Sequence, residues 1–214
     1  MNRALQKRIP NVITLMRIVI AAGFFVALTK FHFNEPEQGI FFGNLAIVLF
    51  VVGALTDFID GYLARKWDVV SMFGRIMDPF CDKVLVLGAF IYFSSPRFMM
   101  GNESNIIHMA TGVYPWMVVV VIARELLVTA IRDVLESIGY SGGANWAGKA
   151  KMILQSIAIP AILLITVNFK PDVNGNLLFL NQILVWLVLV VTVLSSIPYI
   201  SGLLHVMRKS ESES

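Results

Sequence analysis

The sequence predicts an all-α protein that crosses a membrane several times. Hydrophobic residues make up 57% of the 214 residues and charged residues only 14%, whereas a soluble domain has about 45–50% and about 25%. A soluble globule of this size has too much surface to cover with so few charges. The composition therefore excludes a soluble domain, a disordered chain and a protein that binds nucleic acid through a broad basic face.

Six apolar stretches account for the expected membrane helices, because a spanning helix needs about 20 mostly apolar residues. We expect these helices at residues 12–29, 40–55, 84–93, 114–134, 150–168 and 177–204. The second and third reach full length only by including part of the polar segment between Asp57 and Lys83. Pro198 predicts a kink in the long sixth stretch. No linker separates the stretches, so we expect a single membrane domain over residues 1–214.

The basic residues predict the orientation. With six spans, 14 of the 17 Lys and Arg residues fall on the side of the two termini, and the other three are Lys30, Arg97 and Lys170. Loops rich in Lys and Arg stay in the cytoplasm. We therefore expect a multi-pass protein of the cell (inner) membrane, surrounded by membrane lipids, with both termini and the active site on the cytoplasmic side.

Four aspartates lie in the polar segment between the second and third spans. Asp57 and Asp60 are three residues apart, and Asp78 and Asp82 are four apart. On helices these spacings place each pair on one face, and two facing helices would bring the four carboxylates together. Oxygen ligands suit Mg²⁺ or Mn²⁺, and two such ions about 4 Å apart assist displacement at phosphorus. Because acids at membrane depth are costly, we favour a metal site over an ordinary charged loop.

Residues 57–82 resemble the signature of the CDP-alcohol phosphotransferases. The segment reads Asp-x2-Asp-Gly-x2-Ala-Arg-x8-Gly-x3-Asp-x3-Asp, and it matches every fixed position. Other motifs are similar to one branch of that family, the phosphatidylglycerophosphate synthases: Pro10-Asn11-x2-Thr14-x2-Arg17, Ala123-Arg124-Glu125-Leu126 and Trp146-x-Gly148-Lys149-x-Lys151. Met152 departs from the branch, in which Thr usually follows the second Lys.

The resemblance implies a reaction in which CDP-diacylglycerol gives its phosphatidyl group to glycerol 3-phosphate and CMP leaves. In similar proteins the first three aspartates, here Asp57, Asp60 and Asp78, hold two divalent cations. Asp82 would contact a metal and act as the general base. The family also implies a homodimer.

The same resemblance implies the site of the CDP-lipid. The small residues in the signature would give the cytidine room, and the arginine would pair with a donor phosphate. The residues concerned are Asp57, Gly61, Ala64, Arg65 and Gly74.

The acceptor phosphate needs cations that the aspartates cannot supply. Arg124 and Arg132 share a face of the fourth span because they are eight residues apart, and Lys149 and Lys151 begin the fifth span on the same side. We expect these four residues to bind glycerol 3-phosphate. The alternative is that they set the topology or contact lipid headgroups.

Two other functions fit parts of the sequence. A sister enzyme would use inositol phosphate or another alcohol, and only the acceptor pocket would distinguish it. A divalent-cation transporter would also carry acids within its spans. Transport, however, predicts acids deep in several spans, whereas the four aspartates crowd one edge, so the pattern disfavours it.

Overall fold

The computed structural model is a bundle of long helices. It describes residues 3–67, 72–100, 108–139, 146–172 and 175–213, with the backbone alone at 3–11, 13, 36–38, 58–67, 72–76 and 209–213. The helices in this part of the chain are α1 (Arg3–Lys30), α2 (Pro36–Trp67), α3 (Met72–Phe93), α4 (Pro115–Ser137), α5 (Trp146–Asn168), α6 (Asn176–Leu194) and α7 (Ile197–Glu213). The mostly helical architecture agrees with the sequence prediction.

The connection between α3 and α4 is described in part, at residues 94–100 and 108–114. It begins with the 3₁₀ turn η1 (Pro96–Phe98) and contains the two-residue strands β1 (Met99–Met100) and β2 (His108–Met109). The strands pair antiparallel, with Met99 opposite Met109. Two such short strands were not predicted, because their hydrophobic pattern is too brief to show alternation.

α2 and α3 extend beyond their apolar stretches into the polar segment, as the sequence predicted. α2 ends at Trp67 and α3 begins at Met72, so both helices extend into the polar segment that follows the apolar stretch 40–55. Hydropathy marks only the apolar part of a helix. The bounds inferred from it therefore omit the turns that carry the aspartates.

The predicted kink near Pro198 is a break between α6 and α7. α6 ends at Leu194, and the N–H of Ser195 closes it by donating to the carbonyl of Val191 at 2.9 Å. α7 restarts at Ile197, so Pro198 lies in its first turn. Proline is tolerated there because the first N–H groups of a helix have no intrahelical partner.

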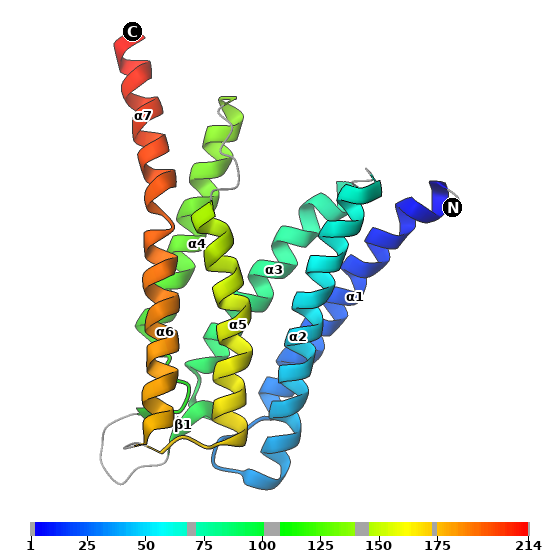
Figure 1. The fold of residues 1–214 in the computed structure, drawn as a ribbon, viewed down its shortest axis with the longest axis vertical. Coiled ribbons are helices and arrows are strands. Elements are labelled where there is room, and N and C mark those ends of the chain that lie inside the picture. Colours follow the sequence, from blue (N-terminus) through cyan, green and yellow to red (C-terminus); the bar gives the residue numbers. More distant parts are fainter. Residues whose placement is uncertain (1–2, 68–71, 101–107, 140–145, 173–174, 214) are drawn as a thin grey trace.

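Three stretches among the described residues are long and apolar enough to cross a membrane. They are Gly39–Asp57 in α2, Trp146–Asn168, and Asn176–Arg208 across α6 and α7. α3 carries its charged residues between its start and its middle, and α4 carries them between its middle and its end, which lowers their hydropathy. The protein is thus a helical membrane protein. The start of α1 and the end of α7 lie at the same end of the bundle (Figure 1).

Glycines let the helices approach closely. A Cβ added at Gly43 in α2 would lie 2.5 Å from Cγ2 of Val167 in α5, and one at Gly88 in α3 would overlap the ring of Phe25 in α1. Real side chains do not pack at such distances, so larger residues would push these helices apart. Close packing of this kind holds helices together where lipid offers no hydrophobic driving force.

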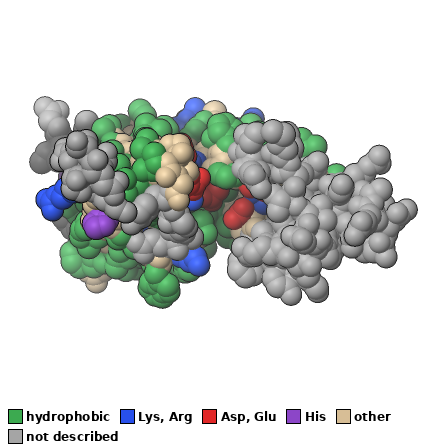
Figure 2. Space-filling model, turned by 90° about the horizontal axis from the view of Figure 1, so that it is seen from above, with side chains coloured by type: hydrophobic (Ala, Val, Ile, Leu, Met, Phe, Trp, Pro, Cys, Tyr) green, Lys and Arg blue, Asp and Glu red, His purple; other side chains and the backbone are tan. Residues whose placement is uncertain are grey.

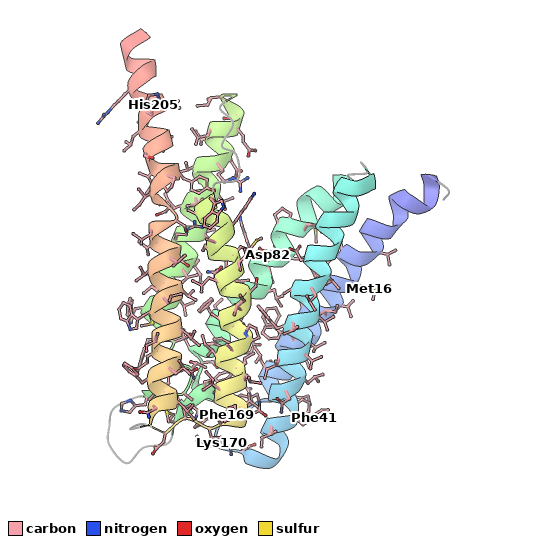
Figure 3. The ribbon with its side chains drawn as sticks, viewed as in Figure 1. Met16, Phe41, Asp82, Phe169, Lys170 and His205 are labelled. Atoms are coloured by element: carbon pink, nitrogen blue, oxygen red, sulfur yellow. The ribbon has the colours of Figure 1, made fainter. Side chains whose placement is uncertain are left out.

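The aromatic core lies toward the end of the bundle opposite the termini. Phe24, Phe50, Phe93 and Phe98 are fully buried. Phe93 ends α3 and Phe98 ends the turn η1 before β1, which Figure 1 shows at that end. Asp82 lies nearer the termini, where α3 faces α5 (Figure 3). The core therefore fixes one end of the bundle, and the polar residues lie toward the other.

Candidate active site

Arg17 on α1 joins two of the predicted aspartates. Its side chain is 2% exposed, and Nη1 lies 2.8 Å from Oδ1 of Asp57 on α2 and 3.3 Å from Oδ1 of Asp78 on α3. Thr14, one turn earlier on α1, donates a hydrogen bond of 2.9 Å to the same oxygen of Asp78. Three helices thus converge on one charged cluster. Both carboxylates remain about a third exposed, so a ligand can reach them.

Asp82 follows Asp78 by one turn of α3. Its side chain is partly exposed, and it lines both an apolar groove of about 340 Å³ and a second, cationic cavity of about 320 Å³. Seen from above, acidic side chains lie near the middle of the molecule with basic ones beside them (Figure 2). Asp82 is therefore the carboxylate at which the two cavities meet.

Several predicted site residues fall outside the described side chains. α2 runs through Asp60, Gly61, Ala64 and Arg65, and α3 runs through Gly74, but the structure describes only the backbone at these positions. Their predicted roles in holding metal and CDP-lipid stay predictions.

The donor chemistry of the cluster fits a divalent cation. Asp57, Asp78 and Asp82 offer only carboxylate oxygens, the ligands that Mg²⁺ and Mn²⁺ prefer, and Arg17 supplies a single positive charge against them. Among the described side chains no three acidic, histidine or cysteine residues are gathered closely enough to form a complete site. The predicted fourth ligand, Asp60, lies outside that set, so the described carboxylates form part of a fitting site.

The cationic cavity contains all four residues predicted to bind the acceptor. It lies where α3, α4, α5 and α7 meet. Its lining includes Asp82, Lys83, Arg124, Glu125, Val128, Thr129, Arg132, Gly148, Lys149, Lys151, Met152 and Tyr199. The four cations come from the consecutive helices α4 and α5; their role in binding the acceptor stays a prediction.

Arg124 is engaged within the protein. Its Nε donates to the carbonyl of Thr192 at 2.9 Å, its Nη2 to Oγ of Ser195 at 2.6 Å, and its Nη1 lies 3.0 Å from Oε1 of Glu125. These bonds satisfy carbonyl and hydroxyl groups where α6 ends. Arg124 therefore fixes the break between α6 and α7 and adds positive charge to the cavity wall.

Glu125 also binds Lys151, so one buried carboxylate holds two of the predicted cations. The Lys151 ammonium donates to the same Oε1 that accepts from Arg124. Glu125 is 8% exposed. A buried charge is costly unless it is paired, and this pairing orients both cations toward the cavity.

Arg132 and Lys149 are the more accessible cations of the cavity. Both side chains are exposed, and Arg132 has only a 3.6 Å contact with Glu136 one turn along α4. An exposed ion pair of this kind contributes little. These two side chains can therefore turn toward an anionic ligand at small cost.

The apolar groove was not predicted. It lies between α2, α3 and α5, with Arg17, Asp57 and Asp82 among its lining and otherwise mostly apolar residues: Phe50, Val51, Gly53, Ala54, Leu55, Leu85, Val86, Met152, Ile153, Ser156 and Ile157. Met152 lines both this groove and the cationic cavity. A long apolar ligand with a charged head would fit such a groove.

The structure brings further residues to the site that the sequence did not assign to it. Arg17 belongs to a motif that the sequence singled out, but its contacts with Asp57 and Asp78 were not predicted; an arginine in an apolar helix is a functional signal in itself. Lys83, which donates to Oγ1 of Thr129 at 2.5 Å, directly follows Asp82 in the sequence. Tyr199 carried no comparable signal, because an aromatic residue near a helix end is usually interfacial.

The fold and the site together define a class: a helical membrane protein in which one carboxylate, Asp82, borders both an apolar groove and a cationic cavity. The chain belongs to the CDP-alcohol phosphatidyltransferase family, whose model matches residues 7–194.

Several curated relatives carry the name CDP-diacylglycerol–glycerol-3-phosphate 3-phosphatidyltransferase. A protein of that name from Bacillus subtilis is 37% identical over 167 residues, which cover 76% of this chain and 79% of the relative. Proteins of the same name from Rickettsia bellii and Salmonella paratyphi A are 28% and 29% identical, and they cover 91% and 92% of this chain and 94% and 96% of their own lengths.

Proposed function

We propose that this protein transfers the phosphatidyl group of CDP-diacylglycerol to glycerol 3-phosphate, giving phosphatidylglycerophosphate and CMP. The observation that carries the proposal is the position of Asp82, which lines both the apolar groove and the cationic cavity. A lipid donor and a charged acceptor must meet at one point, and this carboxylate lies where their two cavities join. The family membership and the name shared by the relatives support the same reaction.

The donor would enter from the membrane. The apolar groove reaches Asp57 and Asp82, so acyl chains could stay in an apolar environment while the pyrophosphate reaches the carboxylates. The predicted nucleotide site adds Asp60, Gly61, Ala64, Arg65 and Gly74 from the signature motif. Two Mg²⁺ or Mn²⁺ ions held by Asp57, Asp60, Asp78 and Asp82 would neutralise the pyrophosphate.

Asp82 would take the proton of the attacking hydroxyl. The oxygen at C1 of glycerol 3-phosphate then forms a bond to the phosphorus of the phosphatidyl group. The bond from that phosphorus to the bridging oxygen breaks, and CMP leaves with the electron pair. A hydroxyl is a weak nucleophile near neutral pH, so a positioned base accelerates this step.

The cationic cavity would hold the phosphate of the acceptor. Arg132 and Lys149 are the accessible cations and would contact the phosphate directly. Arg124 and Lys151 are paired with Glu125 and would act mainly through their charge and by shaping the wall. A cavity with this charge also suits other phosphorylated alcohols, and inositol phosphate is therefore the competing acceptor.

The orientation follows from the same proposal. We place both termini and both cavities on the cytoplasmic side, with six spans in one domain, because 14 of the 17 basic residues lie on that side and the positive-inside rule applies. A homodimer is proposed on family resemblance alone.

The decisive experiment is an assay of CMP release by the purified full-length protein. CDP-diacylglycerol is supplied with glycerol 3-phosphate, inositol phosphate, serine or glycerol, each with Mg²⁺, with Mn²⁺ or with EDTA. We expect release with glycerol 3-phosphate and a divalent cation, and little with the others. Faster release with inositol phosphate would overturn the acceptor, and full activity in EDTA would overturn the metal site.

A further inference from the structure

α7 contributes a residue to the acceptor cavity although it lies beyond the family match. The matched region ends at residue 194, and α7 begins at Ile197. Tyr199, in the first turn of α7, lines the cationic cavity together with residues of α3, α4 and α5. The family pattern therefore does not account for this side of the cavity.

The position of Tyr199 is fixed by packing and by Arg124. The tyrosine is 8% exposed and packs with Val128, Ile131 and Leu135 of α4. Arg124 bonds to the carbonyl of Thr192 and to Ser195, and these bonds hold the α6–α7 break immediately before Tyr199. The side chain is thus anchored at both its ring and its backbone.

The hydroxyl of Tyr199 points toward the start of α5. A Cβ added at Gly148 would lie 3.1 Å from Oη. The hydroxyl therefore lies close against Gly148, and a side chain at position 148 would crowd it. Lys149 follows directly. Within the described part of the chain, no protein group forms a hydrogen bond with this hydroxyl. The hydroxyl oxygen is not among the fully buried polar atoms that lack a partner, so it is open to the cavity, where a ligand can accept its hydrogen bond.

We propose that Tyr199 donates a hydrogen bond to the phosphate of the acceptor, and that α7 thereby helps to determine acceptor specificity. The inference rests on the proposed function. A neutral hydrogen-bond donor next to Lys149 would orient the phosphate, which the other residues of the site hold mainly by charge. Arg132 and Lys149 attract the anion, and Tyr199 fixes its position.

The test compares Tyr199→Phe with the wild-type protein. The substitution keeps the ring and removes only the hydroxyl. We expect KM for glycerol 3-phosphate to rise about tenfold, the loss typical of a hydrogen bond to a charged group, with KM for CDP-diacylglycerol unchanged. Tyr92→Phe is the matched control, because the Tyr92 hydroxyl contacts Thr29 away from the cavity. An unchanged KM for glycerol 3-phosphate would overturn the proposal.

A double-mutant cycle separates a phosphate contact from a packing effect. Gly148→Ala should displace the hydroxyl and raise KM in the wild-type background, but it should add little to Tyr199→Phe, which has no Oη to displace. Coupled residues give such non-additive effects. Fully additive changes would contradict the assigned contact.

Two further measurements identify the group that is bound and keep the test independent of turnover. With 3-hydroxypropyl phosphate, which lacks the C2 hydroxyl, Tyr199→Phe should cause the same loss; an effect confined to glycerol 3-phosphate would overturn the phosphate assignment. Direct calorimetric binding of glycerol 3-phosphate should weaken by the same factor. If wild type binds it but releases no CMP, the proposed reaction fails, while the binding comparison still decides the role of Tyr199.

Discussion

The carboxylate cluster (Asp57 and Asp78 around Arg17) and the cationic cavity share one arrangement of charges, with the signs reversed. In the carboxylate cluster, the buried Arg17 lies between Asp57 and Asp78. In the cationic cavity, the buried Glu125 lies between Arg124 and Lys151. Each region therefore holds like charges together around one buried ion of opposite sign. Such an ion offsets the repulsion that would otherwise push the helices apart.

The two regions differ in how much charge remains for a ligand. The aspartates keep about a third of their surface exposed around a single arginine, which suits cations. In the cavity the inner cations are paired, and the exposed Arg132 and Lys149 remain for an anion. Asp82 borders both regions. The difference suggests that the carboxylate cluster governs turnover, whereas the cavity governs acceptor affinity.

The largest effect should come from removing a carboxylate of the cluster. We expect Asp57→Ala or Asp78→Ala nearly to abolish CMP release, because each loses a metal ligand and leaves Arg17 without one of its partners. EDTA should have the same effect on the wild-type protein. Asp133→Ala, at an exposed position of α4, is the control. Substantial turnover by either cluster variant would show that the cluster serves structure only.

The next effect concerns Asp82, at the junction. Asp82→Asn keeps the size and removes the basicity, so we expect kcat to fall at least ~10²-fold, the usual loss for a general base. Binding of CDP-diacylglycerol, followed by calorimetry, should be retained. If excess Mg²⁺ restored the rate, Asp82 would be a metal ligand only, and its role as the general base would be rejected.

A smaller and more selective effect is expected in the cavity. Arg132→Ala and Lys149→Ala should each raise KM for glycerol 3-phosphate roughly 10-fold to 100-fold, the loss of a charge-assisted bond, with KM for CDP-diacylglycerol unchanged. Lys170→Ala, an exposed lysine at the opposite end of the bundle, is the control. Equal changes in both KM values would mean that these cations set the membrane topology or bind the donor headgroup. The claim that the cavity governs acceptor affinity would then be wrong.

The carboxylate cluster could be predicted from the sequence because its residues lie within 26 positions at helical spacings. Those spacings place Asp57 with Asp60 on one helix face and Asp78 with Asp82 on another; that the two faces meet was an expectation. The cations of the cavity were also predicted, since the positive-inside pattern put them on one side. Glu125 directly follows Arg124 in the sequence, but its pairing with Lys151 and the bond from Arg124 to the carbonyl of Thr192 depend on which helices meet. No residue type marks a backbone acceptor of this kind.

The contacts that depend on where helices cross could not be predicted. Arg17 reaches two helices, and Tyr199 reaches a glycine 51 positions earlier in the chain. Both contacts depend on interhelical geometry that hydrophobic periodicity does not encode. The same reason explains the apolar groove, whose mostly apolar lining comes from four separate helices.

The last prediction tests which side of the membrane the two regions face. The cysteine substitutions used for the test should leave activity unchanged. α4 ends at Ser137 and α6 begins at Asn176, at opposite ends of the bundle, and both side chains are exposed. In intact cells, a membrane-impermeant maleimide should label Asn176→Cys, but should label Ser137→Cys only after permeabilisation. The parent protein, whose Cys81 is buried, gives the background. The reverse pattern would turn both cavities outward, away from cytoplasmic glycerol 3-phosphate, and equal labelling would show that the membrane does not separate the two ends.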